Sequence, residues 1–84
     1  MALFDKITSK LVDFILFVYT NGYVTRSNQN IIKGTMFYLL VWELRDKGIL
    51  VYDGIVNGRK AWKLSGKGEE LAKIFSELRK KGFI

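Results

Sequence analysis

The spacing of the apolar residues changes at Gly48, and this change constrains the fold more than any other feature of the sequence. Before Gly48, apolar residues recur three and four positions apart, as on the buried face of a helix. After it, residues 49–52 and 61–64 form short runs of the kind typical of strands. Between these runs, Asn57-Gly58 predicts a tight hairpin turn, because both residues tolerate positive φ. The sequence therefore predicts an α+β fold in which a hairpin follows a set of helices.

Helical spacing predicts two long helices before the hairpin. The first covers residues 3–20 and ends at Asn21-Gly22. The other covers residues 35–47 and ends at Gly48. Its core-facing residues are Phe37, Leu40, Val41 and Leu44.

Shorter elements are predicted between these two helices. Residues 23–25 are β-prone and predict a single strand-like step. Thr25 or Ser27 can cap a short helix whose buried side is Ile31 and Ile32. After the hairpin, Ser65 is expected to cap a final helix. The apolar stripe of that helix consists of Leu71, Ile74, Phe75 and Leu78.

Two stretches resemble a known group of regulators. Residues 34–50 have apolar core positions, then Leu44-x-x-x-Gly48 and the aliphatic pair Ile49-Leu50, and they resemble the recognition helix of PadR- and MarR-like proteins. Residues 62–71 (WKLSGKGEEL) resemble the aromatic-x-Leu-Thr/Ser-x-x-Gly-x-x-Leu segment that ends the wing in those regulators. They are also similar to archaeal winged-helix proteins that dimerise through a C-terminal helix.

This resemblance implies one winged helix-turn-helix domain over residues 1–84, with a three-helix core, a two-stranded β-wing and a C-terminal helix. One departure concerns residues 36–42, which are seven consecutive apolar or aromatic residues. A typical recognition helix exposes Arg, Lys, Ser, Asn or Gln, so this composition disfavours reading of bases by hydrogen bonds.

The missing residue types narrow the chemistry. The chain has no His and no Cys, so it can build neither an imidazole base, a thiolate nucleophile nor a nitrogen- or sulfur-ligated metal site. The eight Asp and Glu residues follow no recognisable catalytic motif. We therefore expect no enzyme, metal, cofactor or small-molecule ligand. The net charge of +6 favours a polyanion as partner.

Six of the fourteen basic residues lie in two windows without acids, 14–42 and 54–68, which correspond to the helix-turn-helix and the wing. Clustered cations of this kind release counterions when they contact phosphates. Tyr38 and Trp42 are expected either to touch sugars and thymine methyl groups or to pack in the core. The candidate DNA-binding residues are Thr25, Arg26, Ser27, Asn28, Lys33, Thr35, Tyr38, Trp42, Asn57, Arg59 and Lys60.

Almost half of the residues, 49%, are hydrophobic, more than so small a core easily buries. The excess predicts a homodimer through the first and last helices, although a later segment of the same chain can also cover Leu16 and Phe17. The candidate dimer residues are Leu16, Phe17, Ile74, Phe75, Leu78, Phe83 and Ile84.

Together these features predict a small dimeric transcriptional regulator that binds double-stranded DNA sequence-specifically. The alternatives are a protein-interaction winged helix in a transcription assembly and a non-specific architectural DNA-binding protein. The longest apolar run near the start, residues 14–19, is too short to span a bilayer. We therefore expect a cytoplasmic protein, associated with the nucleoid if it binds DNA.

Overall fold

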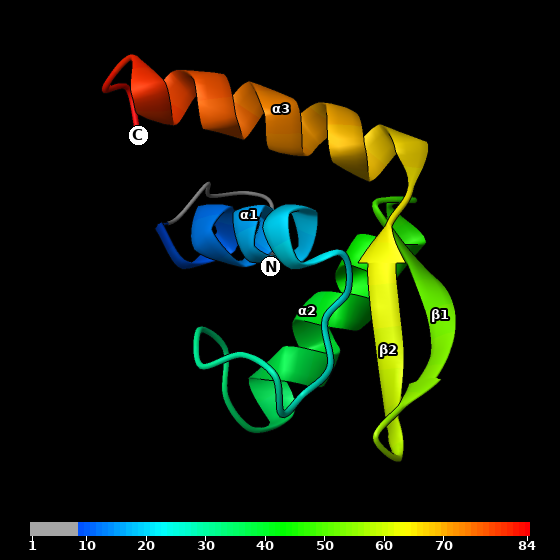
Figure 1. Cartoon of the computed structure of the whole chain (residues 1–84). Helices are drawn as coiled ribbons and strands as arrows, with labels where there is room; N and C mark the ends of the chain where they lie inside the picture. Colours follow the sequence, from blue (N-terminus) through cyan, green and yellow to red (C-terminus); the bar gives the residue numbers. More distant parts are fainter. Residues whose placement is uncertain (1–8) are drawn as a thin grey trace.

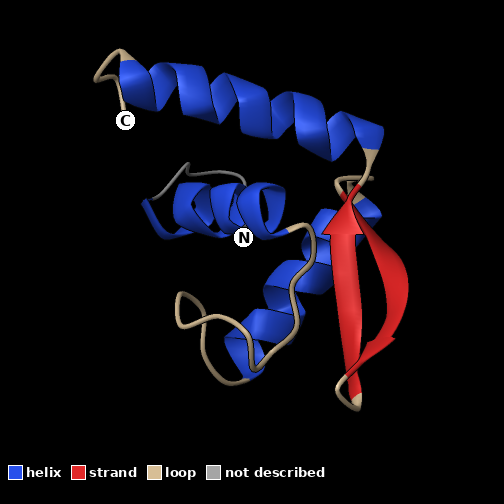
Figure 2. Ribbon diagram, viewed as in Figure 1, coloured by secondary structure: helices blue, strands red, loops and turns tan. Residues whose placement is uncertain are grey.

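The computed structural model describes residues 9–84. In chain order its elements are α1 (Ser9–Asn21), α2 (Thr35–Asp46), β1 (Leu50–Val56), β2 (Arg59–Leu64) and α3 (Gly66–Lys80). Figure 1 shows α3 lying across one end of the molecule. The hairpin turn, the loop over residues 26–34 and the start of α2 lie at the opposite end (Figures 1 and 2). This is a small α+β fold whose arrangement is compatible with that of a winged helix.

Helix α1 packs its apolar face into the core and pairs with α3. Phe14 is fully buried and meets Phe37 of α2 edge to face, with ring centres 6.1 Å apart. On the surface, Asp13 and Arg79 of α3 form an ion pair of 2.7 Å. The predicted end of this helix at Asn21-Gly22 is confirmed, whereas its predicted first part, over residues 3–8, lies outside the described residues.

Helix α2 follows the sequence prediction closely. Its buried residues are Phe37, Leu40, Val41 and Leu44, the four expected to face the core. The helix ends because Gly48 adopts a positive φ of 77°. There the N–H of Gly48 donates to the carbonyl of Arg45 at 2.9 Å, and that of Ile49 to the carbonyl of Leu44 at 2.8 Å. These two bonds satisfy the last carbonyls of the helix and turn the chain into β1.

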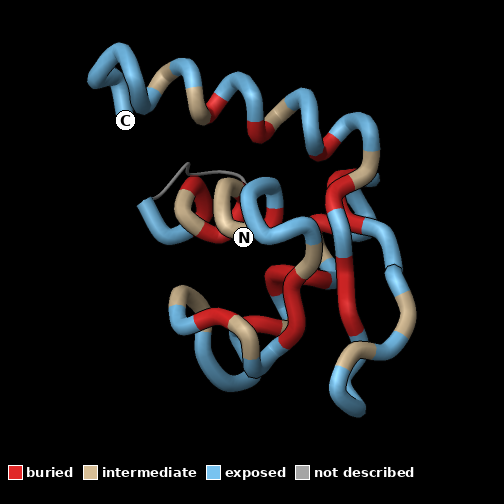
Figure 3. The backbone as a smooth tube through the Cα atoms, in the orientation of Figure 1, coloured by how far each residue is buried: buried red, intermediate tan, exposed pale blue. Residues whose placement is uncertain are grey.

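Strands β1 and β2 form the predicted antiparallel hairpin. Asn57 and Gly58 both have positive φ, at 51° and 77°, which gives the turn the twist that a two-residue hairpin needs. The strands run further than the predicted β-type runs, because Gly54, at a φ of 88°, allows an irregularity in the register between Tyr52 and Ile55. The hairpin therefore projects from the core, with its tip exposed (Figure 3).

A single-residue bridge adds a third segment to this sheet. Val24 and Trp62 exchange two backbone hydrogen bonds of 2.8 and 2.9 Å. Val24 is fully buried, and Trp62 is 7% exposed. The predicted strand-like step at residues 23–25 is confirmed.

The predicted short helix with Ile31 and Ile32 on its buried side is wrong. Residues 26–33 form a loop, although both isoleucines still pack against the core. Thr25 and Asn28 do exchange the reciprocal bonds of a helix-starting capping box, because each side chain accepts from the other's backbone N–H. The chain does not continue as a helix, because the next N–H groups donate to the buried side chain of Gln29 and not to backbone carbonyls. Its oxygen accepts from the N–H groups of Ile31 and Ile32, each at 2.8 Å.

Helix α3 begins at the predicted cap, because the Ser65 hydroxyl accepts from the N–H of Gly68 at 3.0 Å. Its predicted apolar stripe is only partly correct: Ile74 is 55% exposed, whereas Ala72 is fully buried. The reason is close contact at the start of the helix. A Cβ at Gly68 would lie 2.3 Å from the carbonyl oxygen of Ile49, so only small residues fit on the face that meets the core there.

Candidate nucleic-acid interface

The tip of the hairpin carries two cations at the end of the molecule opposite α3. Asn57, Arg59 and Lys60 are all exposed. In the register of the hairpin, Arg59 lies opposite Val56 and Lys60 opposite Ile55. Neither cation has an ion-pair partner within residues 9–84. Both charges therefore face solvent at a protruding turn, where a large anionic partner can reach them.

The loop over residues 26–34 carries two more exposed cations, Arg26 and Lys33, together with exposed Ser27. Two other candidates of this region have structural roles. Thr25 is 3% exposed, so its place among the candidate DNA-binding side chains is wrong. Asn28 is half-buried, and its side-chain oxygen accepts from the backbone N–H of Thr25 at 2.9 Å. These two side chains shape the loop and leave its exposed positions to the cations.

Arg26 connects this loop to α2 through an aromatic row. Its guanidinium carbon lies 5.9 Å from the centre of the Tyr38 ring, within the range of a cation–π contact. The Tyr38 ring in turn lies 6.1 Å from that of Trp42. Tyr38 is half-buried and packs edge to face on Phe37, as expected of a core aromatic. Trp42 is 47% exposed, so it is available to a partner.

The outer face of α2 is apolar over its first two turns. Met36 and Leu39 are each 49% exposed, and neither was among the predicted site residues. Their position was readable from the sequence, because the four core residues of this helix occupy its other side. Thr35 is exposed at the start of the same helix, as predicted. The acidic residues of α2, Glu43 and Asp46, come only in its last turn.

These features produce an uneven charge distribution. Arg26, Lys33, Arg59 and Lys60 belong to the end formed by the loop and the hairpin tip, and the stretches 14–42 and 54–68, which include these segments, contain no acid. On α3, at the opposite end (Figure 1), cations and acids are interspersed: four Lys or Arg residues alternate with three of the eight acids. The end where α2 begins therefore differs from α3 in that its cations come from stretches without carboxylates.

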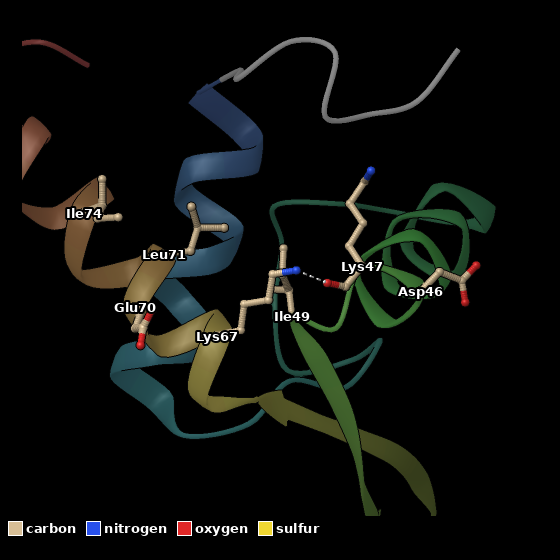
Figure 4. Close-up of a pocket in the computed structure, with 7 residues that line it drawn as sticks. All are labelled: Asp46, Lys47, Ile49, Lys67, Glu70, Leu71 and Ile74. Carbon is tan, nitrogen blue, oxygen red and sulfur yellow. Dashed lines mark hydrogen bonds between the residues drawn. The ribbon is translucent and has the colours of Figure 1, made fainter.

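A surface pocket of different character lies where the end of α2 meets the start of α3 (Figure 4). The Lys67 ammonium donates to the carbonyl of Lys47 at 2.9 Å across it. Its lining residues are Asp46, Lys47, Ile49, Lys67, Glu70, Leu71 and Ile74. Because two acids balance two lysines there, this pocket does not favour phosphate. Within residues 9–84, no three acidic side chains gather as metal ligands would.

The candidate dimer residues divide into three groups. Phe75 is 2% exposed, so its assignment to a surface between subunits is wrong, because it belongs to the core. Leu16, Phe17 and Leu78 are half-buried, and the first two pack against the core of their own chain. The exposed candidates are Ile74, Phe83 and Ile84.

None of the three helices in the described part of the chain is long and apolar enough to cross a membrane. Comparison of the chain with known protein families, curated proteins and solved structures finds no match.

Proposed function

We propose that this protein is a winged helix-turn-helix protein that binds double-stranded DNA and regulates transcription as a small homodimer. A loop held by Gln29 then occupies the place of the short helix that precedes the recognition helix. The observation that carries the proposal is the position of four exposed cations around the start of α2, in stretches without a carboxylate. Polyanion binding depends on such clustering, because each neutralised phosphate releases counterions.

In this arrangement the two basic elements hold the phosphate backbone on either side of α2. Arg59 and Lys60 at the hairpin tip reach phosphates or the adjacent minor groove, while Arg26 and Lys33 contact the backbone from the loop. Helix α2 then faces the major groove with Thr35 near its start. The phosphate contacts supply affinity, and the face of α2 supplies any preference between sequences.

The homodimer is proposed through the far end of the molecule, where Ile74, Phe83 and Ile84 are exposed. A two-fold pairing of these residues leaves both basic ends free. It presents two α2 helices to successive major grooves, about one helical turn apart.

Equilibrium binding to a pool of random-sequence duplexes, measured at two salt concentrations, tests the proposal. We expect binding at low salt and a steep loss of affinity as the salt concentration rises. Enrichment of one sequence from the pool separates a sequence-specific regulator from an architectural protein, which binds all duplexes alike. Absence of duplex binding at low salt contradicts the proposal.

One observation favours a second candidate, a winged helix that binds another protein. Met36, Leu39 and Trp42 are each about half exposed along one face of α2, and clustered exposed apolar side chains mark many protein interfaces. If the protein has this second function, we expect either no affinity for duplex DNA or an affinity that does not change when the hairpin cations Arg59 and Lys60 are replaced.

A further inference from the structure

The outer face of α2 has an unusual chemistry for a helix that faces DNA. Leu39 lies at the centre of this face, with Met36 one turn before it and Trp42 one turn after, and all three are 47–49% exposed. Large apolar side chains are normally buried, so three of them on one exposed face indicate a partner that supplies apolar surface of its own.

The same face offers few hydrogen bonds. Residues 35–44 contain no Arg, Lys, Asn or Gln, the side chains that pair with guanine or adenine through two hydrogen bonds at once. The remaining polar groups on this side of the first two turns are the Thr35 and Tyr38 hydroxyls and the Trp42 indole N–H. Reading of guanine or adenine by paired hydrogen bonds is therefore excluded for this stretch of α2.

The charges around this face identify the class of partner. The loop that precedes α2 carries Arg26 and Lys33, and Arg26 lies against Tyr38, beside Trp42. No acid occurs between residues 14 and 42. An apolar strip with cations beside its first two turns, and with its nearest acids, Glu43 and Asp46, only after Trp42, complements a surface whose centre is partly apolar and whose borders are anionic. The major groove of DNA is such a surface where it carries thymine, because the C5-methyl group of this base projects into the groove between two rows of phosphates.

We propose that α2 recognises thymine through apolar contacts between Leu39, Met36 and Trp42 and the C5-methyl groups in the major groove. This inference rests on the proposed DNA-binding function and specifies what that site prefers. The preference for thymine then comes from the removal of water around its methyl groups, and it needs no paired hydrogen bonds to base edges. The preferred duplexes are rich in thymine, and their guanine content has little influence.

Replacement of thymidine by deoxyuridine isolates the methyl group. One pool of random-sequence duplexes, each about two helical turns long, is made in two forms that differ only in this substitution. Base pairing and every hydrogen-bonding group stay the same, so a difference in affinity at one salt concentration reports the methyl contacts. A buried methyl changes affinity roughly fourfold, so two contacts make the thymidine pool bind about fifteenfold more tightly.

Two matched variants locate the contact. Leu39→Ala is expected to reduce this preference to about fourfold or less. Ile55→Ala removes an apolar side chain of similar exposure, 59%, from the hairpin. It is expected to keep the preference, because a wing on phosphates or in the minor groove meets no thymine methyl.

The outcomes distinguish this inference from the proposed function. Equal affinity for both pools, with binding intact, contradicts thymine reading, leaves DNA binding standing and points to a partner protein for this face. If Ile55→Ala reduces the preference for the thymidine pool as much as Leu39→Ala does, the assignment of the methyl contacts to α2 is contradicted. Absence of binding to either pool contradicts both the inference and the proposed function.

Discussion

The side-chain amide of Gln29 bonds to the backbone of Ile32 at both ends: its oxygen accepts from the Ile32 N–H at 2.8 Å, and its nitrogen donates to the Ile32 carbonyl at 2.7 Å. The same amide accepts from the N–H of Ile31 and donates to the carbonyl of Arg26. Gln29 is 8% exposed, and its four bonds to these backbone groups are partly buried. One side chain thus fixes the loop that carries Arg26 and Lys33.

Gln29→Ala is expected to destabilise the fold by about 2–3 kcal/mol, because it leaves partly buried backbone donors and acceptors unpaired. Urea unfolding measures this loss. The matched control is Asn30→Ala at the exposed neighbouring position, where a change within about 0.5 kcal/mol is expected. Equal stability of the two variants would show that the loop does not depend on the amide.

Gly68→Ala is expected to destabilise the protein by about 3 kcal/mol, because the new methyl group would lie 2.3 Å from the Ile49 carbonyl oxygen and 3.1 Å from Leu64. Gly66→Ala, two residues earlier in α3, is the control. A Cβ there meets nothing within 4 Å, so the substitution is expected to be neutral or slightly stabilising. Thermal unfolding of both variants gives the comparison. A Gly68→Ala protein as stable as the wild type would refute the close packing of α3 on the residue before β1.

A dimer is expected at micromolar concentration in sedimentation equilibrium. Ile74→Asp should convert it to a folded monomer, because a charge in an apolar contact between subunits is costly, whereas at a 55%-exposed position it barely affects the fold. Ile55→Asp places the same charge on the hairpin, at the other end of the molecule, and should leave the dimer intact. A wild-type protein that sediments as a monomer contradicts the dimer.

Several elements were predictable because their signals are local. Helical spacing identified the four buried residues of α2, and the positive-φ tolerance of Asn57-Gly58 identified the hairpin turn. Ser65 was recognisable as a helix cap from its residue type and position. In each case, residues close in sequence determine the geometry.

The predictions that were wrong, or that were not made, concern contacts with side chains or segments that the local sequence pattern does not describe. Thr25 and Asn28 form the start of a helix, but the side chain of Gln29 then replaces the backbone bonds, and no periodicity reports this. Ala72 replaces Ile74 on the buried face because α3 lies against Ile49, a residue distant in sequence. At the candidate site, the contact of Arg26 with Tyr38 depends on the path of the loop, which sequence spacing does not give.

The most direct test of the central proposal is the salt dependence of duplex binding for Arg59→Ala/Lys60→Ala, compared with Lys73→Ala/Lys80→Ala. Both double variants remove two exposed positive charges, the first from the hairpin tip and the second from α3. If the hairpin cations contact phosphates, the first variant loses affinity for all sequences, and the slope of log K against log salt falls by about 2. The α3 variant keeps the wild-type slope. Equal slopes for the wild type and both variants would contradict a DNA-binding hairpin.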